Sequence, residues 1–184
     1  MPKQRITKEM VVNAAFELAR DGQQVIIKNI AKRLNCSVQP IYSYCNNMEG
    51  LRDEVAGKAR IYLQQYMETH IDPEDPFRTT GQAYLQLSKE EPHILKLYIT
   101  SKRNNVSSLD DLYRMEANPQ MAEAIAKSLH ISAKCAKALH LHMIIYTIGL
   151  GTISSVSSPG ISAEEIFQQQ EQAYLAFLHT FTNT

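Results

Sequence analysis

The sequence has no tryptophan and only seven glycines and seven prolines in 184 residues. Glycine and proline interrupt regular structure, whereas the long stretches rich in Ala, Leu, Gln, Glu and Lys consist of good helix formers. We therefore expect an all-α fold rather than a sheet. With 44% hydrophobic residues, the chain can bury one sizeable core or two small cores joined by a shared helix.

Cysteine is scarce, and its pattern disfavours two kinds of site. Cys36, Cys45 and Cys135 are odd in number and lack CxxC spacing, so we expect neither a disulfide framework nor a zinc site. The N-terminus lacks the apolar segment of a signal peptide, and the longest nearly apolar stretch, residues 143–153, is too short to span a bilayer. We expect a cytoplasmic protein.

Net charge is absent from the chain as a whole but not from its parts. Nineteen basic and nineteen acidic side chains cancel, which by itself disfavours nucleic-acid binding, because duplexes are bound through Lys and Arg. Residues 1–60, however, carry ten basic and six acidic side chains, a net charge of +4, and the rest carries nine and thirteen, a net charge of −4. The chain is therefore electrically two-part, and its first part is basic.

Apolar residues recur at helical spacing along most of the chain. Thr7 is suited to cap a first helix that ends at Arg20. Ser162 and Glu165 form a capping box at the start of the last helix. The helices expected beyond residue 45 cover about residues 47–70, 77–89, 92–103, 108–116, 119–129, 132–156 and 162–184.

Residues 26–45 have the spacing of a helix-turn-helix motif. Apolar residues at i, i+3, i+4 and i+7 give residues 27–34 one buried face. Asn35 suits a left-handed turn and Ser37 suits an N-cap, so a second short helix, residues 38–45, follows closely. In such a motif the second helix lies in the major groove and the first crosses the DNA backbone.

The outward side of residues 38–45 supplies groups that can read DNA. Gln39 can pair with adenine in a bidentate way, and Val38 can contact a thymine methyl group. The hydroxyls of Tyr42 and Ser43 can reach bases or phosphates, and Lys28 is placed for a phosphate. The alternative at this point is a merely solvated, basic helical subdomain.

The same residues resemble the signature of TetR-type transcriptional regulators. The matching pattern is Ile30-Ala31-x-x-Leu34-x-Cys36-Ser37-x-x-x-Ile41-Tyr42-x-Tyr44, followed by Glu49-x-Leu51. The detailed match covers residues 7–56, and the remainder is similar only in helix number, about nine in all, and in its two long final helices. The resemblance implies a three-helix DNA-binding domain at 1–50 and a helical bundle for ligand binding and dimerisation at 51–184.

The resemblance also implies DNA contacts around the motif. In this family the position of Tyr42 typically touches phosphate, as does the start of the next helix. This chain departs from the family pattern at Met48, where a phosphate-binding Lys is frequent, at Ile26, where a capping Thr is common, and at Pro40, which removes a backbone donor. Tyr44 is either a contact or a core residue. The expected DNA-binding residues are Lys3, Arg5, Lys28, Ser37, Val38, Gln39, Pro40, Tyr42, Ser43, Tyr44, Asn46, Asn47 and Met48.

Polar side chains within the apolar helices of the second part are candidates for a ligand pocket, since buried polar groups pair with each other or serve a ligand. His140 and His142 diverge by about 200° on a helix and cannot share one ion, so we expect no metal site and no cofactor. Each candidate could instead be an internally paired core residue. The candidates are Tyr62, Tyr66, Tyr84, Tyr98, Arg103, Tyr113, His140, Met143 and Tyr146.

The last two helices carry apolar and small residues that suit a four-helix dimer interface. Two recognition helices must lie about 34 Å apart to meet successive major grooves, which requires a dimer built away from the DNA. An internal monomer core would have the same periodicity and stays the alternative. The expected interface residues are Ile144, Ile145, Ile148, Gly149, Thr152, Phe167, Tyr174, Leu175 and Leu178.

Three functions are compatible with these patterns to different degrees. The first, which the family resemblance implies, is a sequence-specific regulator that binds a palindromic operator as a homodimeric repressor and is released by a small-molecule effector. The alternative is a protein-interaction adaptor that kept the fold but binds DNA weakly, which Met48 and the modest basic charge favour. An enzyme is disfavoured because the sequence has no Gly-rich phosphate loop, nucleophile elbow or acid–base pair at workable spacing.

Overall fold

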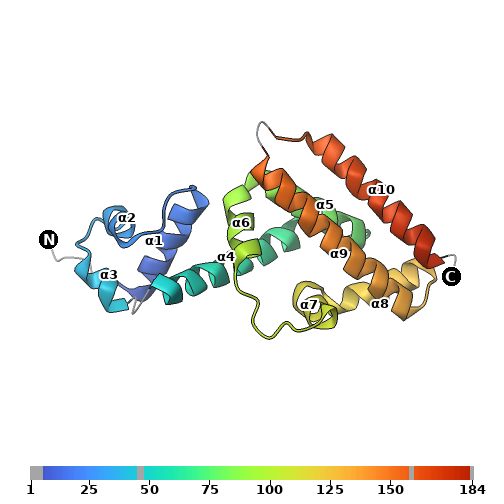
Figure 1. The fold of residues 1–184 in the computed structure, drawn as a ribbon, viewed down its shortest axis with the longest axis horizontal. Helices are drawn as coiled ribbons and strands as arrows, with labels where there is room; N and C mark the ends of the chain where they lie inside the picture. Colours follow the sequence, from blue (N-terminus) through green and yellow to red (C-terminus); the bar gives the residue numbers. More distant parts are fainter. Residues whose placement is uncertain (1–5, 45–47, 158–159, 183–184) are drawn as a thin grey trace. The chain divides into compact units, whose positions relative to one another are not determined.

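A computed structural model describes residues 6–44, 48–157 and 160–182. Within these ranges every regular element is a helix, which confirms the all-α prediction (Figure 1). The helices number ten there, one more than the family outline of about nine, because each segment expected from periodicity forms its own helix. They are α1 (Lys8–Arg20), α2 (Ile27–Arg33), α3 (Gln39–Tyr44), α4 (Met48–His70), α5 (Pro76–Glu90), α6 (Pro92–Thr100), α7 (Leu109–Glu116), α8 (Pro119–Leu129), α9 (Ala133–Val156) and α10 (Ala163–Thr182).

Local signals in the sequence place several helix ends. Thr7 Oγ1 accepts a hydrogen bond from Met10 N at 3.2 Å, as expected of an N-cap. Ser162 Oγ likewise accepts one from Glu165 N at 3.1 Å. Asn35 has the left-handed conformation predicted for it, with φ 49°. These three helix-end predictions follow from one or two residues each and are confirmed.

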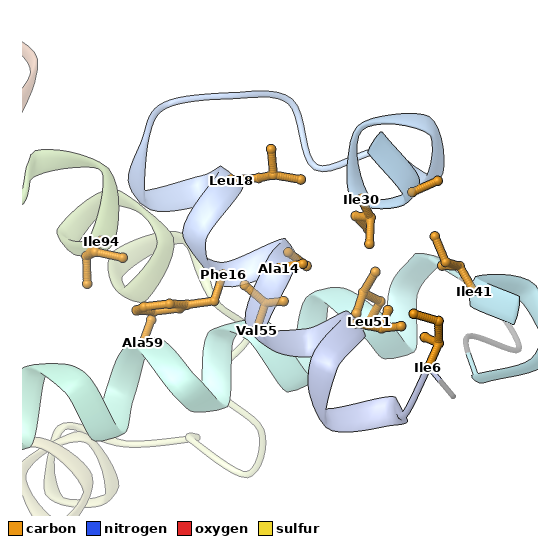
Figure 2. Close-up of a cluster of buried hydrophobic side chains, with 13 residues drawn as sticks. Ile6, Ala14, Phe16, Leu18, Ile30, Ile41, Leu51, Val55, Ala59 and Ile94 are labelled. Atoms are coloured by element: carbon orange, nitrogen blue, oxygen red, sulfur yellow. The ribbon is translucent and has the colours of Figure 1, made fainter. Parts of the chain in front are cut away.

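The described helices form two compact units. Unit 1 comprises Met1–Gln65 and His93–Lys102, and so includes α1 to α3, most of α4 and nearly all of α6. A continuous apolar cluster fills it (Figure 2). Among its buried members are Ile6, Ala14, Phe16, Leu18, Ile30, Ile41, Leu51, Val55, Ala59 and Ile94.

Unit 1 extends beyond residue 50, the domain boundary predicted from the sequence. Leu51 and Val55 of α4 are buried in the same cluster as α1. Ile94 of α6 is also buried there, and the His93 ring lies so close to Gly22 that a Cβ on this glycine would be 2.6 Å from His93 Nε2. The compact unit therefore includes residues beyond 50, because α4 and α6 complete the core of α1.

Unit 2 comprises Tyr66–Pro92 and Arg103–Thr184 and is organised around α9. Helices α5, α8 and α10 pack against α9, and Leu139 and Met143 of α9 share a buried cluster with Ile125 of α8. Among the described helices, α9 alone has the length and hydropathy of a membrane span, with 24 residues and a mean hydropathy of 1.3. The sequence-based prediction considered only the nearly apolar residues 143–153, which are too few to span a bilayer, and so did not indicate this length. In unit 2, α9 contacts three other helices, α5, α8 and α10.

The contribution of α6 to unit 1 is testable with Ile94→Ala. Truncating a fully buried isoleucine costs about 2–5 kcal/mol, so urea unfolding should shift to lower denaturant and amide exchange in α1 should accelerate. Lys96→Ala, at an exposed position of the same helix, is the matched control and should change stability by less than about 0.5 kcal/mol. Unchanged exchange in α1 of the Ile94 variant would show that α1 folds without α6.

Candidate functional site

The connection between α2 and α3 is a tight turn closed by backbone hydrogen bonds. Cys36 N donates to Ala31 O at 3.0 Å, and Asn35 N donates to Lys32 O at 3.2 Å. Asn35, which lies between α2 and α3, has a left-handed backbone conformation of the kind that commonly ends a helix, and the chain changes direction there. The first residue of α3, Gln39, follows three residues after Cys36. The pair therefore has the short turn that a helix-turn-helix motif needs.

α3 has one buried side and one exposed side. Ile41 is completely buried in the unit 1 cluster, where Figure 2 places it near Ile30 of α2. Val38 and Tyr42, by contrast, are 43% and 61% exposed. Gln39 and Ser43 are exposed as well. These four positions follow helical spacing i, i+1, i+4 and i+5, so they share one side of the helix, which we call the reading face: Val38, Gln39, Tyr42 and Ser43.

The other residues expected at DNA lie in varied surroundings. Lys28 and Ser37 are exposed, and Pro40 is half-buried in the first turn of α3. Tyr44 and Met48 pack against the unit 1 cluster, which corresponds to the core alternative for Tyr44 and gives Met48 a packing contact in place of a cation. Four expected residues lie outside the described part of the chain: Lys3, Arg5, Asn46 and Asn47.

Ion pairs engage part of the positive charge of unit 1. They are Lys8 with Glu54, Arg33 with Asp21, and Lys102 with Glu49. The Lys102 ammonium, through its hydrogen bond and its charge, holds the pKa of Glu49 below the usual value. Lys28, Lys32 and Arg52 are exposed and form no hydrogen bond or ion pair with the residues that the structure describes. These three cations lie on α2 and α4, the helices that flank α3 in the sequence.

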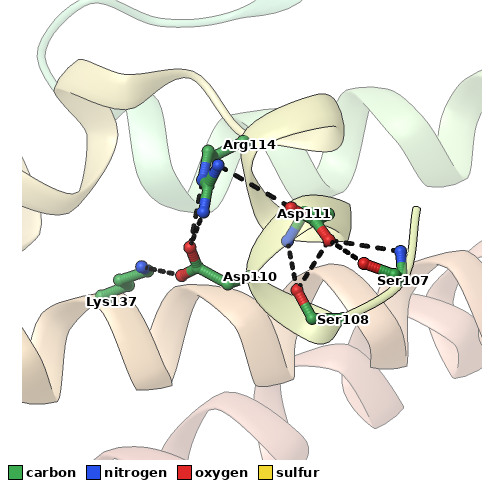
Figure 3. Close-up of polar contacts among 6 residues, drawn as sticks. All are labelled: Ser107, Ser108, Asp110, Asp111, Arg114 and Lys137. Carbon is green, nitrogen blue, oxygen red and sulfur yellow. Dashed lines mark hydrogen bonds and ion pairs between the residues drawn. The ribbon is translucent and has the colours of Figure 1, made fainter. Parts of the chain in front are cut away.

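In unit 2, polar contacts hold α7 against α9 (Figure 3). Asp110 of α7 binds Lys137 of α9 and Arg114 of its own helix, and these hydrogen bonds lower the pKa of Asp110 to about 2. Ser108 caps α7 by accepting from Asp111 N at 3.1 Å, while its hydroxyl donates to the Asp111 carboxylate at 2.8 Å. A helix of eight residues has little stability of its own, so these contacts position α7.

Tyr113 and His140 form a buried polar pair between the same two helices. The Tyr113 hydroxyl oxygen is hydrogen-bonded to His140 Nδ1 at 2.9 Å. Phe77 of α5 meets the His140 ring edge-on, with 5.7 Å between ring centroids. Burial lowers the pKa of His140 to about 4 and raises the pKa of Tyr113. Near pH 7 the pair therefore consists of two neutral groups that satisfy each other inside unit 2.

Helices α9 and α10, which pack together, also expose apolar residues. Ile145, Ile153 and Val156 of α9 and Leu175 of α10 are about half exposed or more. A Cβ on Gly149, also exposed, would meet nothing within 4 Å. The α9 members recur at helical spacing and so form one stripe. We call these five residues the apolar stripe; surfaces of this kind commonly contact another protein.

The whole chain resembles a solved structure. Its fold matches the crystal structure of a TetR-family transcriptional regulator from Haemophilus influenzae with a TM-score of 0.57, over 92% of this chain and 94% of that chain, at 21% sequence identity. The chain has the TetR-family fold. No family model matches the sequence, and no curated protein matches it. The fold is therefore identified from the three-dimensional arrangement of the helices, and the motif at residues 30–51 agrees with it.

In this TetR-family fold, the candidate pocket residues divide between the two units. Tyr62 and Tyr98 belong to unit 1, where the Tyr62 hydroxyl accepts a hydrogen bond from Arg20 at 3.3 Å. In unit 2, Tyr113 and His140 are joined directly, whereas Tyr66 donates to the Glu90 carboxylate at 2.6 Å. The remaining four candidates also belong to unit 2: Tyr84, Arg103, Met143 and Tyr146.

Several polar partners within unit 2 were not predicted from the sequence. Arg103 Nε donates to Glu116 at 2.9 Å, and the Glu116 side chain is only 6% exposed. Gln170 donates to Thr147 at 3.2 Å, and both are buried. A signal for Gln170 existed, because it lies at helical spacing from the buried Ile166. Glu116 had no such signal, since a charged residue near a helix end usually indicates exposure.

Of the expected interface residues, three are exposed and six are half-buried. The exposed ones, Ile145, Gly149 and Leu175, belong to the apolar stripe. Tyr174 and Leu178 pack against the buried cluster of unit 2, so they contribute to the monomer core. The half-buried residues are Ile144, Ile148, Thr152, Phe167, Tyr174 and Leu178. Ile153 and Val156 were not among the expected residues, although their helical spacing from Ile145 was visible in the sequence.

The buried His140 should make stability depend on pH. Its pKa is about 4 in the folded protein against 6.5 for the ordinary group, so the unfolded chain binds more protons between these values. The stabilisation is complete above about pH 6.5, decreases as the pH falls towards 4, and levels off below, a loss on the order of 3 kcal/mol. Urea unfolding measured from about pH 7 to about pH 4 tests this.

Two variants make the assignment specific. His140→Phe should lose this part of the pH dependence, because the titrating group is gone. His179→Gln, which removes an exposed histidine of α10, should retain it. Equal pH dependence in the wild type and in His140→Phe would contradict a neutral, buried His140.

Proposed function

We propose that the protein is a sequence-specific, DNA-binding transcriptional regulator. The observation that carries this proposal is the reading face. Its four side chains are exposed on a short helix and on the residue directly before it, and this helix follows a tight turn and is anchored by the buried Ile41. A helix presented in this way fits the major groove. The TetR-family fold supports the same role. The proposed DNA-binding part is residues 1–50, and the proposed site residues are those named in the sequence analysis.

The proposed active form is a cytoplasmic homodimer bound to a palindromic operator. A two-fold dimer buries the same surface on both subunits, and the apolar stripe on α9 and α10 offers such a surface. Residues 51–184 would thus supply dimerisation as well as effector binding. We propose that the protein acts as a non-enzymatic repressor.

The proposed regulation is release from DNA by a small-molecule effector bound in unit 2. The Tyr113–His140 pair is the observation that supports this, because paired neutral polar groups among aromatic rings can exchange their mutual hydrogen bond for one to a ligand. Glu116, three residues after Tyr113 on α7, is paired with Arg103, so these two residues add no net charge beside the Tyr113–His140 pair. No cofactor is part of the proposal.

A second function, a protein-interaction adaptor with weak DNA binding, is favoured by one specific observation. Met48 packs against the unit 1 cluster at the start of α4, and carboxylates engage Lys8 and Arg33. Unit 1 therefore has less unpaired positive charge available to bind DNA than its composition implies. Protein capture through α5 to α10, with DNA affinity that does not vary with sequence, would favour this alternative.

Direct DNA binding is tested with genomic fragments in gel shifts at several salt concentrations. The regulator should select particular fragments, and its affinity should fall with salt, with a log–log slope of about −0.9 for each phosphate neutralised. Lys28→Ala should weaken all complexes similarly and reduce the slope by about 1. Lys127→Ala, an exposed lysine of α8 in unit 2, is the control and should change neither quantity. Equal affinity for all fragments would contradict sequence-specific regulation.

The dimer surface is tested with Ile153→Glu. A charge in the middle of the apolar stripe should be buried on association at high cost, so sedimentation should show monomers and binding to a palindrome should weaken. Ile61→Glu is a matched control, because Ile61 of α4 is 58% exposed and Ile153 is 55% exposed; this variant should sediment as the wild type does. A dimer that persists in Ile153→Glu would place the interface elsewhere.

A further inference from the structure

The reading face carries no charged side chain. Residues 37–44 contain no Lys, Arg, Asp, Glu or His, and all of them are described by the structure. In the major groove, guanine is read chiefly by bidentate Arg or Lys, and the amino group of cytosine by Asp or Glu. The side-chain types that most often specify a G·C pair are therefore missing from α3 and from the turn before it.

Cations of neighbouring elements are poorly placed to substitute for them. Arg33, at the end of α2, is held by Asp21, and Lys8 is held by Glu54. Lys28 and Lys32 lie at i and i+4 on the outer side of α2. Because the first helix of a helix-turn-helix pair crosses the DNA backbone, cations on it meet phosphates rather than base edges.

The two residues at the start of α3 are suited to A·T pairs. The residues at the N-terminal end of a recognition helix are the ones that contact bases. Here these are Gln39, the first residue of α3, and Val38, which directly precedes it. The Gln39 amide offers one donor and one acceptor, which match N7 and the N6 amino group of adenine. The exposed methyl groups of Val38 match the thymine methyl group. The Ser43 hydroxyl donates to Gln39 O at 3.3 Å, within its own helix.

We infer that the base pairs covered by α3 in each operator half-site are A·T pairs, with adenine opposite Gln39 and thymine opposite Val38. This inference rests on the proposed function and adds the class of DNA sequence that is recognised. Affinity then comes from cations on the adjoining helices, and base preference from neutral groups on α3.

The test is selection of bound sequences from randomised duplexes by the full-length protein, followed by sequencing. The wild type should select an inverted repeat. Gln39→Ala should reduce the preference for adenine at one position of each half-site by about fivefold to 150-fold. Val38→Ala should reduce the preference for thymine at a neighbouring position. Gln39→Arg should replace that adenine with guanine. Gln82→Ala, an exposed glutamine of α5 in unit 2, is the matched control and should select the wild-type repeat.

The outcomes separate this inference from the proposed function. A selected repeat with G·C pairs at the positions that the two alanine variants alter would overturn the inference and leave sequence-specific binding intact. A repeat that neither variant alters would overturn it as well. If no repeat is selected at all, the proposed function fails, and the inference fails with it.

Discussion

The burial of Ile41 is the contact on which the reading face depends. α3 has six residues, too few for a stable isolated helix. Its single fully buried side chain joins the cluster formed by α1, α2 and α4. Because Ile41 takes the inner side, helix geometry turns Val38 and Tyr42 to the solvent. One apolar anchor therefore determines both where the helix lies and which side chains it presents.

The sequence alone was sufficient for those features that depend on neighbouring residues. Thr7 and Asn35 act through hydrogen bonds and backbone conformations within a few residues, so the helix ends that they determine could be predicted. The alternation of exposed and buried positions in α3 was predictable for the same reason, since helical geometry converts spacing directly into direction. The all-helical class follows from many such local preferences acting together.

Periodicity could not show which element covers a given apolar face. α6 has an apolar side that would suit either unit, and only the packing of Ile94 and of the His93 ring against Gly22 assigns it to unit 1. The tyrosines show the same limit: Tyr62 and Tyr113 have similar apolar neighbours in sequence but lie in different units. The buried Glu116 depends on Arg103, thirteen residues away, and no local pattern announces such a partner.

The arrangement of charge in unit 1 separates two contributions that a net charge combines. Phosphate attraction is the same for every sequence, and it would come from Lys28, Lys32 and Arg52, which lie on α2 and α4. Discrimination between bases would come from α3, which is neutral from end to end. Substitutions on the flanking helices can therefore change affinity without changing base preference. Substitutions on α3 do the reverse, because they leave the phosphate-directed cations in place. In a regulator of the proposed kind, one or two neutral side chains would change the target sequence while the affinity for the DNA backbone stays constant.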